Sequence, residues 1–297
     1  MLGGGRPASI RSWCSLNPSA VVWFLVTSPS LVGSSWLDLK AVAAVHRNLR
    51  LAYLDVGLAL NGTPFAQLYT STKFSETDVD YLPNNLSNMC RLAVVYKSGG
   101  FYTDMDTLAL RSVLNLTNFI ALHIDEIKSF NNAAFHFKRG HPMLQLIMQF
   151  IAEDYNGIIY SWNGPIAITK AVERSGCDAT PRNAMGQPVS DEPRPFSSET
   201  SLKIINEHDE QPELCDWLAL KTSYFYPVYW AHALPTLFLA PVESNNKTIH
   251  EIFPDSYGVH FCNKLTKERN PRKSSLLLKI AQQVCPLIIK NHPLLRN

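Results

Sequence analysis

The sequence lacks the features that assign a chain to several common classes of protein. It contains no run of about 18 consecutive apolar residues, the length that a membrane-spanning helix requires. The net charge is only +2, which argues against nucleic acid as a partner. None of the six cysteines forms a C-x-x-C pair, so a zinc cluster is not expected. Residues 1–14 also lack the apolar core of a secretory signal peptide.

The composition of the 297 residues is typical of an ordered globular protein. Apolar residues make up 46% of the chain and charged residues 18%, which argues against disorder. The cysteines are compatible with buried thiols or with a few disulfides. Four N-x-S/T tripeptides favour a secretory compartment; they begin at Asn61, Asn85, Asn115 and Asn246. Because no signal peptide accompanies them, either the chain is cytosolic and the tripeptides are chance, or its natural N-terminal segment is missing.

Apolar patterning predicts an α/β domain. Runs at 20–30 and 49–56 predict buried strands, and their helix-sized separation predicts a parallel sheet. Residues 178–200 are rich in proline, serine and charge, and predict an exposed loop. We expect a single domain over 1–297 with irregular insertions. Helical spacing predicts helices over 86–98, 142–151, 164–176 and 274–285.

The stretch YKSGGFYTDMDTLAL contains a pair of acids with a chemical use. A double glycine closes the preceding helix, and a short strand over 101–103 delivers Asp104 and Asp106. If strand alternation continues, both carboxylates face one side and Met105 turns into the core. Two such oxygen donors suit Mn²⁺ or Mg²⁺, which can bridge a diphosphate. The pattern alone would favour a solvated turn, but its place at the end of a buried strand favours a ligand site.

The segment RLAVVYKSGGFYTDMDTLAL resembles the sugar-donor site of the alpha-1,4-galactosyltransferase and alpha-1,4-N-acetylglucosaminyltransferase family. That family has an Arg, then a helix, then Gly-Gly-x-Tyr-x-Asp-x-Asp. The resemblance extends from about residue 14 to residue 285, because further blocks follow in the family's order. They are CSLNPSAVVWFLVTSP, FNNAAFHFKRGHPML, YNGIIYSWNGPIAITKAV, FYPVYW and SYGVHFCNKL.

The resemblance implies a GT-A-like, Rossmann-type nucleotide-sugar-binding sheet flanked by helices. It also implies Mn²⁺, a UDP-sugar donor and retention at the anomeric carbon. The expected reaction moves a hexose or N-acetylhexosamine, in alpha-1,4 linkage, to a galactose-type terminal sugar of a glycosphingolipid or glycoprotein. Residues 14–120 would form the donor half and residues 121–297 the acceptor half. Family members are type II proteins of the Golgi membrane with a lumenal catalytic domain.

The resemblance also assigns roles to residues, several of which have a structural alternative. Asp104, Asp106 and His260 are the expected metal ligands. Donor binding is expected from these two aspartates and from Arg91, Gly99, Gly100, Tyr102 and Lys264. Substrate hydroxyls would meet Asn131, Asn132, Asn163 and Gly164. Alternatively, Arg91 supports the acidic turn by an ion pair, Lys264 is solvated, and the asparagines and Gly164 form turns.

The remaining expectations concern sugar stacking by two tryptophans and the identity of a catalytic nucleophile. Trp162 and Trp230 could stack on sugar faces, although core packing is the commoner fate of tryptophan. No carboxylate stands out as a nucleophile, since Glu153 and Asp154 look solvated. The hypothesis is therefore a front-face mechanism, in which the leaving phosphate itself deprotonates the acceptor.

The sequence departs from the family pattern in several places. Asn88 replaces an aspartate, Cys262 replaces a tryptophan beside His260, and Asn163 stands where mammalian members carry glutamine. Members also begin with a cytoplasmic tail, an anchor, a stem and a strand with a Phe-x-Glu-Thr-Ser-like motif, and we expect that this chain starts after all of them. Two alternatives follow: a non-catalytic binding or scaffold protein of the same fold, or a metal-dependent hydrolase of nucleotide diphosphates.

Overall fold

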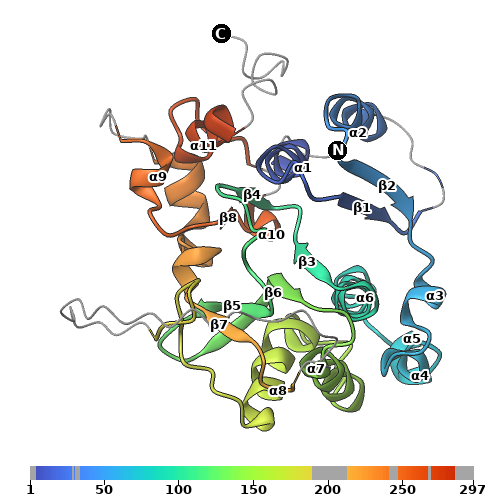
Figure 1. Cartoon of the computed structure of the whole chain (residues 1–297). Helices are drawn as coiled ribbons and strands as arrows, with labels where there is room; N and C mark the ends of the chain where they lie inside the picture. The colour runs from blue at the N-terminus through green and yellow to red at the C-terminus, as the bar shows by residue number, and fades with distance from the viewer. Residues whose placement is uncertain are drawn as a thin grey trace.

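The computed structural model describes residues 5–28, 30, 34–188, 213–240, 247–266 and 269–284. Figure 1 shows helices packed around small sheets. The α-helices are α1 (Gly5–Leu16), α2 (Ser34–Val45), α3 (Val56–Leu60), α4 (Phe65–Tyr69), α5 (Thr72–Ser75), α6 (Leu82–Ser98), α7 (Pro142–Glu153), α8 (Ala167–Ser175), α9 (Ile249–Ile252), α10 (Asn263–Thr266) and α11 (Leu276–Val284). Shorter helical turns are η1 (Trp162–Ile166), η2 (Thr222–Tyr224), η3 (Trp230–His232) and η4 (Leu234–Leu239).

The strands of the described residues form three sheets. The first is a parallel pair, β1 (Val22–Val26) and β2 (Leu49–Tyr53). The second has four strands in the order β3 (Gly100–Thr103), β6 (Ser129–Phe137), β5 (Phe119–Ile124) and β7 (Leu218–Leu220). The third is an antiparallel pair, β4 (Thr107–Ala109) and β8 (Gly258–His260).

The prediction of an α/β domain is confirmed, but the prediction of a parallel sheet is only partly right. Parallel pairing joins β1 to β2 and β5 to β7, whereas β6 is antiparallel to both β3 and β5. The reason lies in the connection between β5 and β6. It is a tight turn in which the Lys128 amide donates to the Asp125 carbonyl at 3.1 Å. Strands joined by so short a turn can pair only in the antiparallel sense.

The prediction that 20–30 forms a buried strand is wrong in one respect, because β1 is covered on only one face. Val22 and Phe24 pack against α1 and α2, in a cluster that includes Ile10 and Leu39. Between them on the strand, Trp23 points outward and is 61% exposed. A continuous apolar run does not distinguish a fully buried strand from one with an apolar exposed face.

Helix α6 begins four residues earlier than predicted, with a proline in its first turn, and ends where predicted. Gly99 caps it with φ of 69°, and its amide donates to the Val95 carbonyl at 2.8 Å. A Cβ at Gly99 would lie 2.9 Å from the Arg139 amide nitrogen, so only glycine fits the turn into β3. Together with α7 and α8, this helix buries one face of the four-stranded sheet (Figure 1).

The other predicted helices are present with adjusted ends. Helix α7 begins at Pro142 and α11 covers 276–284. The helix predicted from Gly164 is α8, which begins only at Ala167 because Gly164 is non-helical (φ −135°, ψ −113°) inside a π-helical turn. Residues 178–188 of the predicted loop form no helix, and 189–200 lie outside the described residues.

The cysteines include both a disulfide and buried free thiols, the two states that the sequence allowed. Cys177 and Cys215 form a disulfide, with Cα atoms 5.4 Å apart. Cys14, Cys90 and Cys262 are buried free thiols, and Cys285 lies outside the described residues. Within the described ranges, no helix has the length and apolar character needed to cross a bilayer.

Candidate metal centre

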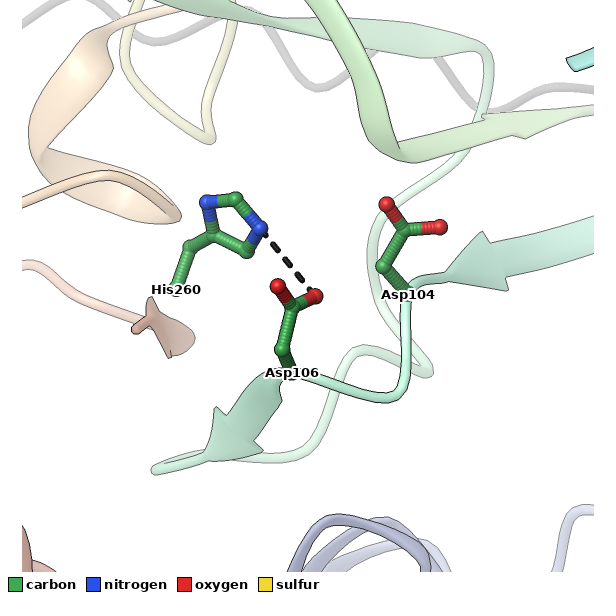
Figure 2. A group of neighbouring side chains, drawn as sticks. All are labelled: Asp104, Asp106 and His260. Carbon is green, nitrogen blue, oxygen red and sulfur yellow. Dashed lines mark ion pairs between the residues drawn. The ribbon is translucent and has the colours of Figure 1, made fainter. Parts of the chain in front are cut away.

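Asp104 and Asp106 occupy the turn that connects β3 to β4. The turn is fixed by backbone hydrogen bonds: the Asp104 amide donates to the Ala133 carbonyl at 2.9 Å, and the Thr107 amide donates to the Asp104 carbonyl at 3.2 Å. The prediction that Met105 turns into the core is wrong, because this residue is half-buried in the turn. Strand alternation stops at Thr103, but the Asp106 carboxylate points toward His260 and the Asp104 carboxylate lies near both (Figure 2).

Asp104 is held by two groups that come from its own strand and from α6. Its Oδ1 lies 2.9 Å from Arg91 Nη1 and accepts a hydrogen bond of 2.7 Å from the Tyr102 hydroxyl. Arg91 is 7% exposed and also donates to the Asn132 carbonyl at 2.9 Å and to Ser87 Oγ at 2.9 Å. Burial opposes the charge of Arg91, but Asp104 raises its pKa overall. The contacts therefore give Arg91 the supporting role that the sequence left as an alternative.

Asp106 is held from the opposite side by β8 and the turn after it. Its carboxylate lies 3.1 Å from His260 Nε2 and accepts the Asn263 amide at 2.7 Å, while its carbonyl accepts the Phe261 amide at 2.8 Å. Burial works against both charges, yet His260 lowers the pKa of Asp106 to about 2 and Asp106 raises the pKa of His260 well above 6.5. The two groups form an ion pair when no cation is bound.

Register explains why a histidine 154 residues further along the chain reaches this turn. Thr107 pairs with His260 in the β4–β8 ladder, so the side chain that precedes Thr107 meets the imidazole. On the far side of the ring, Cys262 Sγ lies 3.4 Å from His260 Nδ1. The backbone of Cys262 is left-handed, with φ of 52°. The thiol thus contacts His260 at the position where the family has a tryptophan.

The three side chains match the ligand set of a divalent cation. One ligand atom each from Asp104, Asp106 and His260 can be chosen so that all lie within 4.8 Å of one another (Figure 2). Carboxylate oxygens and a neutral imidazole suit Mn²⁺, and the oxygens alone suit Mg²⁺. The side chains are partly exposed, so a ligand can reach them from solvent. The residues expected to bind a metal therefore fit one.

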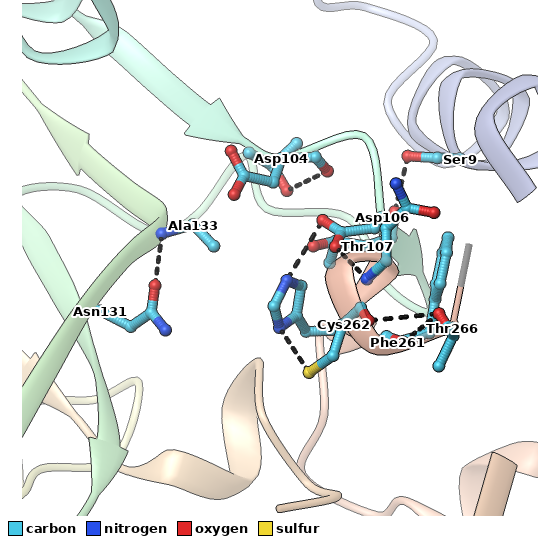
Figure 3. Close-up of polar contacts among 12 residues, drawn as sticks. Ser9, Asp104, Asp106, Thr107, Asn131, Ala133, Phe261, Cys262 and Thr266 are labelled. Carbon is cyan, nitrogen blue, oxygen red and sulfur yellow. Dashed lines mark hydrogen bonds and ion pairs between the residues drawn. The ribbon is translucent and has the colours of Figure 1, made fainter. Parts of the chain in front are cut away.

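The predicted hydroxyl-binding asparagines mostly serve the scaffold. Asn132 Nδ2 donates to Asn88 Oδ1 at 3.0 Å, and Gly164 packs against this pair, since a Cβ there would lie 3.0 Å from Asn88 Nδ2. Asn163 is fully buried. Its side-chain oxygen accepts the Asn156 amide, and its side-chain nitrogen donates to the Asn156 carbonyl. Asn131, which is half-buried, accepts the Ala133 amide at 3.0 Å beside the metal ligands (Figure 3).

Three further residues were predicted to bind the donor: Gly99, Gly100 and Lys264. Gly99 and Gly100 form the turn at the opposite end of β3, so their role in donor binding stays a prediction. The Lys264 ammonium lies 3.0 Å from the ring centroid of Tyr160. The Tyr160 ring is near enough to Asp106 and Asp104 for their charges, together with burial, to raise the pKa of its hydroxyl.

The two tryptophans differ in their surroundings. The indole of Trp162 donates to the Asp154 carbonyl at 2.8 Å, and the Lys170 ammonium lies 4.0 Å from its ring centroid. Trp230 is 42% exposed and lies 5.3 Å from the ring of Tyr229. Trp230 therefore has a surface that can stack on a sugar, and this role stays a prediction.

Sequence reasoning missed Tyr226 and His123, which line the same face of the sheet. The ring of Tyr226 meets His260 edge-on with centroids 5.6 Å apart, and His123 lies 5.9 Å from Tyr226. Tyr226 belongs to the block FYPVYW, so its membership in a family segment was the available signal. Its contact with His260 arises only from tertiary packing.

Comparisons with known families agree with this geometry. A family model described as a glycosyltransferase sugar-binding region containing a DXD motif matches residues 7–129. A second model, the alpha 1,4-glycosyltransferase conserved region, matches residues 136–193 and 202–292, which is half of the chain. Together with the mixed sheet and its helical cover, the DXD match confirms the predicted GT-A-like fold class.

Individual relatives are more distant. The chain is 31% identical to lactosylceramide 4-alpha-galactosyltransferase of Pongo pygmaeus, over 43% of this chain and 56% of that protein. It is 24% identical to the Rattus norvegicus protein of the same name, over 94% of this chain and 69% of that protein. It is 29% identical to Homo sapiens alpha-1,4-N-acetylglucosaminyltransferase, over 54% and 47%. The chain thus spans 56% of the length of the first of these relatives.

A solved structure, "PaToxG Glycosyltransferase", is 15% identical, covering 58% of this chain and 63% of that chain with a TM-score of 0.44.

Proposed function

The chain belongs to the alpha-1,4-glycosyltransferase family, and from that membership we propose that it transfers a hexose or N-acetylhexosamine from a UDP-sugar. The acceptor is a galactose-type terminal sugar on a glycosphingolipid or glycoprotein, and the new bond is alpha-1,4. The names of the relatives support both donor classes, galactosyl and N-acetylglucosaminyl. The observation that carries the proposal is the convergence of Asp104, Asp106 and His260 from two distant segments.

We propose Mn²⁺ as the cation that these three residues hold. When bound, the cation neutralises charge on the diphosphate that leaves the sugar. The protein's own part is to prepare the ligands. Arg91 and Tyr102 fix Asp104, and the Asn263 amide fixes Asp106. His260 must give up its Nε2 proton to bind the cation, and its Nδ1 proton can then be donated toward Cys262 Sγ, 3.4 Å away.

Two residues that depart from the family pattern, Asn88 and Cys262, do not separate the three metal ligands. Asn88 accepts a hydrogen bond from Asn132, and Cys262 contacts His260 without displacing it. These observations support the enzyme over the non-catalytic alternative. The exposed positions of Asn61 and Asn115 are compatible with the proposed Golgi location, because a protein that reaches the Golgi has passed through the part of the secretory pathway where such asparagines are glycosylated.

For the retention of configuration we propose the front-face route. Glu153 and Asp154 lie at the end of α7, where they pair with Arg174 at 3.7 Å and Lys170 at 3.8 Å, so neither is positioned as a nucleophile. The departing phosphate then takes the acceptor's proton. Mass spectrometry of the enzyme quenched during turnover tests this route, and a covalent glycosyl adduct would overturn it.

The proposed function is tested by measuring donor hydrolysis and sugar transfer with UDP-galactose, UDP-N-acetylgalactosamine and UDP-N-acetylglucosamine, with and without Mn²⁺. We expect activity only with the cation, and a loss on the order of 100-fold or more in Asp104→Asn with Asp106→Asn. Glu126→Gln, at an exposed position on the β5–β6 turn, is the matched control and should retain activity. Activity that survives the double substitution would refute the metal assignment. Hydrolysis that no acceptor sugar accelerates would instead identify a nucleotide-diphosphate hydrolase.

A further inference from the structure

Tyr226 is a buried tyrosine that the metal assignment leaves unused. It lies between η2 and η3 and is 3% exposed. Its ring stands perpendicular to that of His260, with an interplanar angle of 89°, and lies edge-on to His123. Its position is therefore fixed by packing against one of the three expected metal ligands.

The hydroxyl of Tyr226 has no hydrogen-bond partner among the described residues. The backbone of Ala134 lies near the Tyr226 oxygen, but no hydrogen bond of acceptable geometry joins them. Buried hydroxyls are normally satisfied, because leaving one unpaired loses its hydrogen bonds to water without replacement. Because this unpaired hydroxyl packs against an expected metal ligand, a molecule bound at that site could complete its hydrogen bond.

A phenol carries its proton at neutral pH and is then a neutral hydrogen-bond donor. The molecule that meets the Tyr226 hydroxyl must therefore supply an acceptor. Asp104 Oδ1 already accepts from Tyr102 and contacts Arg91.

We propose that the Tyr226 hydroxyl donates a hydrogen bond to the diphosphate of the UDP-sugar held at Asp104, Asp106 and His260. This inference rests on the proposed function, since that function brings a diphosphate to these residues. An anionic oxygen is the strongest acceptor that the site would receive, and hydrogen bonds to charged acceptors are stronger than neutral ones. Tyr226 is thus a donor-binding residue in addition to those predicted from the sequence.

The test compares wild type with Tyr226→Phe, which removes only the hydroxyl. Titration calorimetry with UDP in saturating Mn²⁺ should show affinity reduced roughly 10-fold or more. Uridine, which has no phosphate, should bind both proteins equally. Mn²⁺ affinity without nucleotide, followed by electron paramagnetic resonance, should not change. The urea midpoint of the free protein should stay the same or rise, because the substitution removes an unpaired buried group.

Tyr224→Phe, at the end of η2 and two residues before Tyr226, is the matched control. The Tyr224 hydroxyl accepts the Ala184 amide at 3.0 Å, so its loss should lower the urea midpoint and leave UDP affinity unchanged. Equal UDP affinity in wild type and Tyr226→Phe would overturn the inference alone. A fall in the urea midpoint of Tyr226→Phe equal to that of Tyr224→Phe would also overturn it, because it would reveal a structural partner such as a buried water. If the wild-type protein binds no UDP at all, both this inference and the proposed function are refuted.

Discussion

At the scale of the residue, the site is organised by pairs of charges whose partners come from different segments. Arg91 from α6 holds Asp104, and His260 from β8 holds Asp106. Each carboxylate is thus neutralised before any cation arrives, which offsets the cost of placing two acids beside each other. Among the residues that the structure describes, the buried hydroxyls of Tyr226 and Thr107 at this site have no such partner.

The pair of Arg91 and Asp104 gives a prediction about stability. Arg91→Met should lower the free energy of unfolding by about 3 kcal/mol, because it removes the positive partner of Asp104 and the donor to the Asn132 carbonyl. Asp104→Asn in the same protein should recover at least about 1 kcal/mol, since the uncompensated charge is then gone. Urea unfolding of both single variants and the double variant measures this coupling. Additive losses would show that the two side chains do not interact.

The glycosylation tripeptides give a second prediction at this scale. Asn85 lies inside α6 and is 1% exposed, whereas Asn61 and Asn115 are exposed. In protein secreted from eukaryotic cells, we expect glycans at Asn115 and, less completely because Pro64 follows its tripeptide, at Asn61. Peptide mapping after deglycosylation in heavy-oxygen water reads out each position. Folded protein with a glycan at Asn85 would contradict the burial of α6.

Much of this residue-level picture follows from the sequence, but not all of it. The pair Asp104 and Asp106 is visible as a motif, and His260 is visible within a family block. The hydrogen bonds that occupy Asn132 and Asn163 are invisible there, because an asparagine in a turn and one facing a sugar have the same sequence signature. Tyr226 could not be identified from the sequence, since only the fold reveals that its hydroxyl has no partner in the part of the chain that the structure describes.

At the scale of the element, the site depends on a short ladder between β4 and β8. This ladder sets the register of His260 relative to the acidic turn, and α1 supports it from behind. The Thr107 carbonyl accepts both Ser9 Oγ at 2.7 Å and the Trp13 indole at 3.1 Å, and Figure 3 includes the contact from Ser9. The N-terminal helix thereby fixes the strand that follows Asp106.

Gly258→Ala tests this ladder. A Cβ at Gly258 would lie 3.0 Å from Thr107 Cγ2 and 3.3 Å from the Leu108 carbonyl, so β8 must shift away from β4. We expect a loss of about 1–3 kcal/mol in unfolding free energy. Mn²⁺ affinity, measured by electron paramagnetic resonance, should fall several-fold because His260 moves with its strand.

Gly57→Ala is the control for this prediction, since a Cβ there meets only Asp55 Oδ1 at an ordinary 3.4 Å and the residue lies in α3. It should leave both stability and Mn²⁺ affinity near the wild-type values. Unchanged Mn²⁺ affinity in Gly258→Ala would show that the ladder does not position His260.

Elements differed in how well the sequence predicted them, for a physical reason. Helix α7 was predictable because its apolar residues recur with helical spacing over a long segment after a proline. The pairing of strands could not be predicted, since the sequence of one strand does not identify the strand that it pairs with. β4 and β8 have three residues each and meet across more than half of the chain. Only the packing of the whole domain brings them together.

At the scale of the whole molecule, the two faces of the four-stranded sheet have different tasks. One face is buried by α6, α7 and α8 in the largest apolar cluster. The opposite face packs small residues, such as Ala121 and Ala133, against Phe225 and Tyr226. Small side chains on that face allow the segment 222–230 and β8 to approach the sheet closely. The β3–β4 turn and β8, which carry the acids and His260, consequently lie on the other side of the sheet from α6, α7 and α8 (Figure 1).

Two histidines with lowered pKa values, the half-buried His136 and the fully buried His141, make the stability of the protein depend on pH. His136 accepts the Asn118 amide at 3.0 Å through Nδ1, and burial, with a smaller effect of Lys138, lowers its pKa to about 4. The pKa of His141, which accepts the Met143 amide, is also lowered by burial. Between about pH 6.5 and pH 4 the unfolded chain binds protons that the folded protein does not. The free energy of unfolding must therefore decrease as pH falls through this window.

His136→Gln isolates one of these contributions, because an amide oxygen can still accept the Asn118 proton but does not titrate. The loss of stability between pH 6.5 and pH 4 should become shallower than in wild type by about 1.4 kcal/mol per pH unit. Urea unfolding in metal-free buffer at several pH values gives both slopes. His250→Gln, at an exposed position on α9, should keep the wild-type slope. If His136→Gln and wild type lose stability in parallel, His136 is protonated in the folded protein and the hydrogen bond from Asn118 does not hold it neutral.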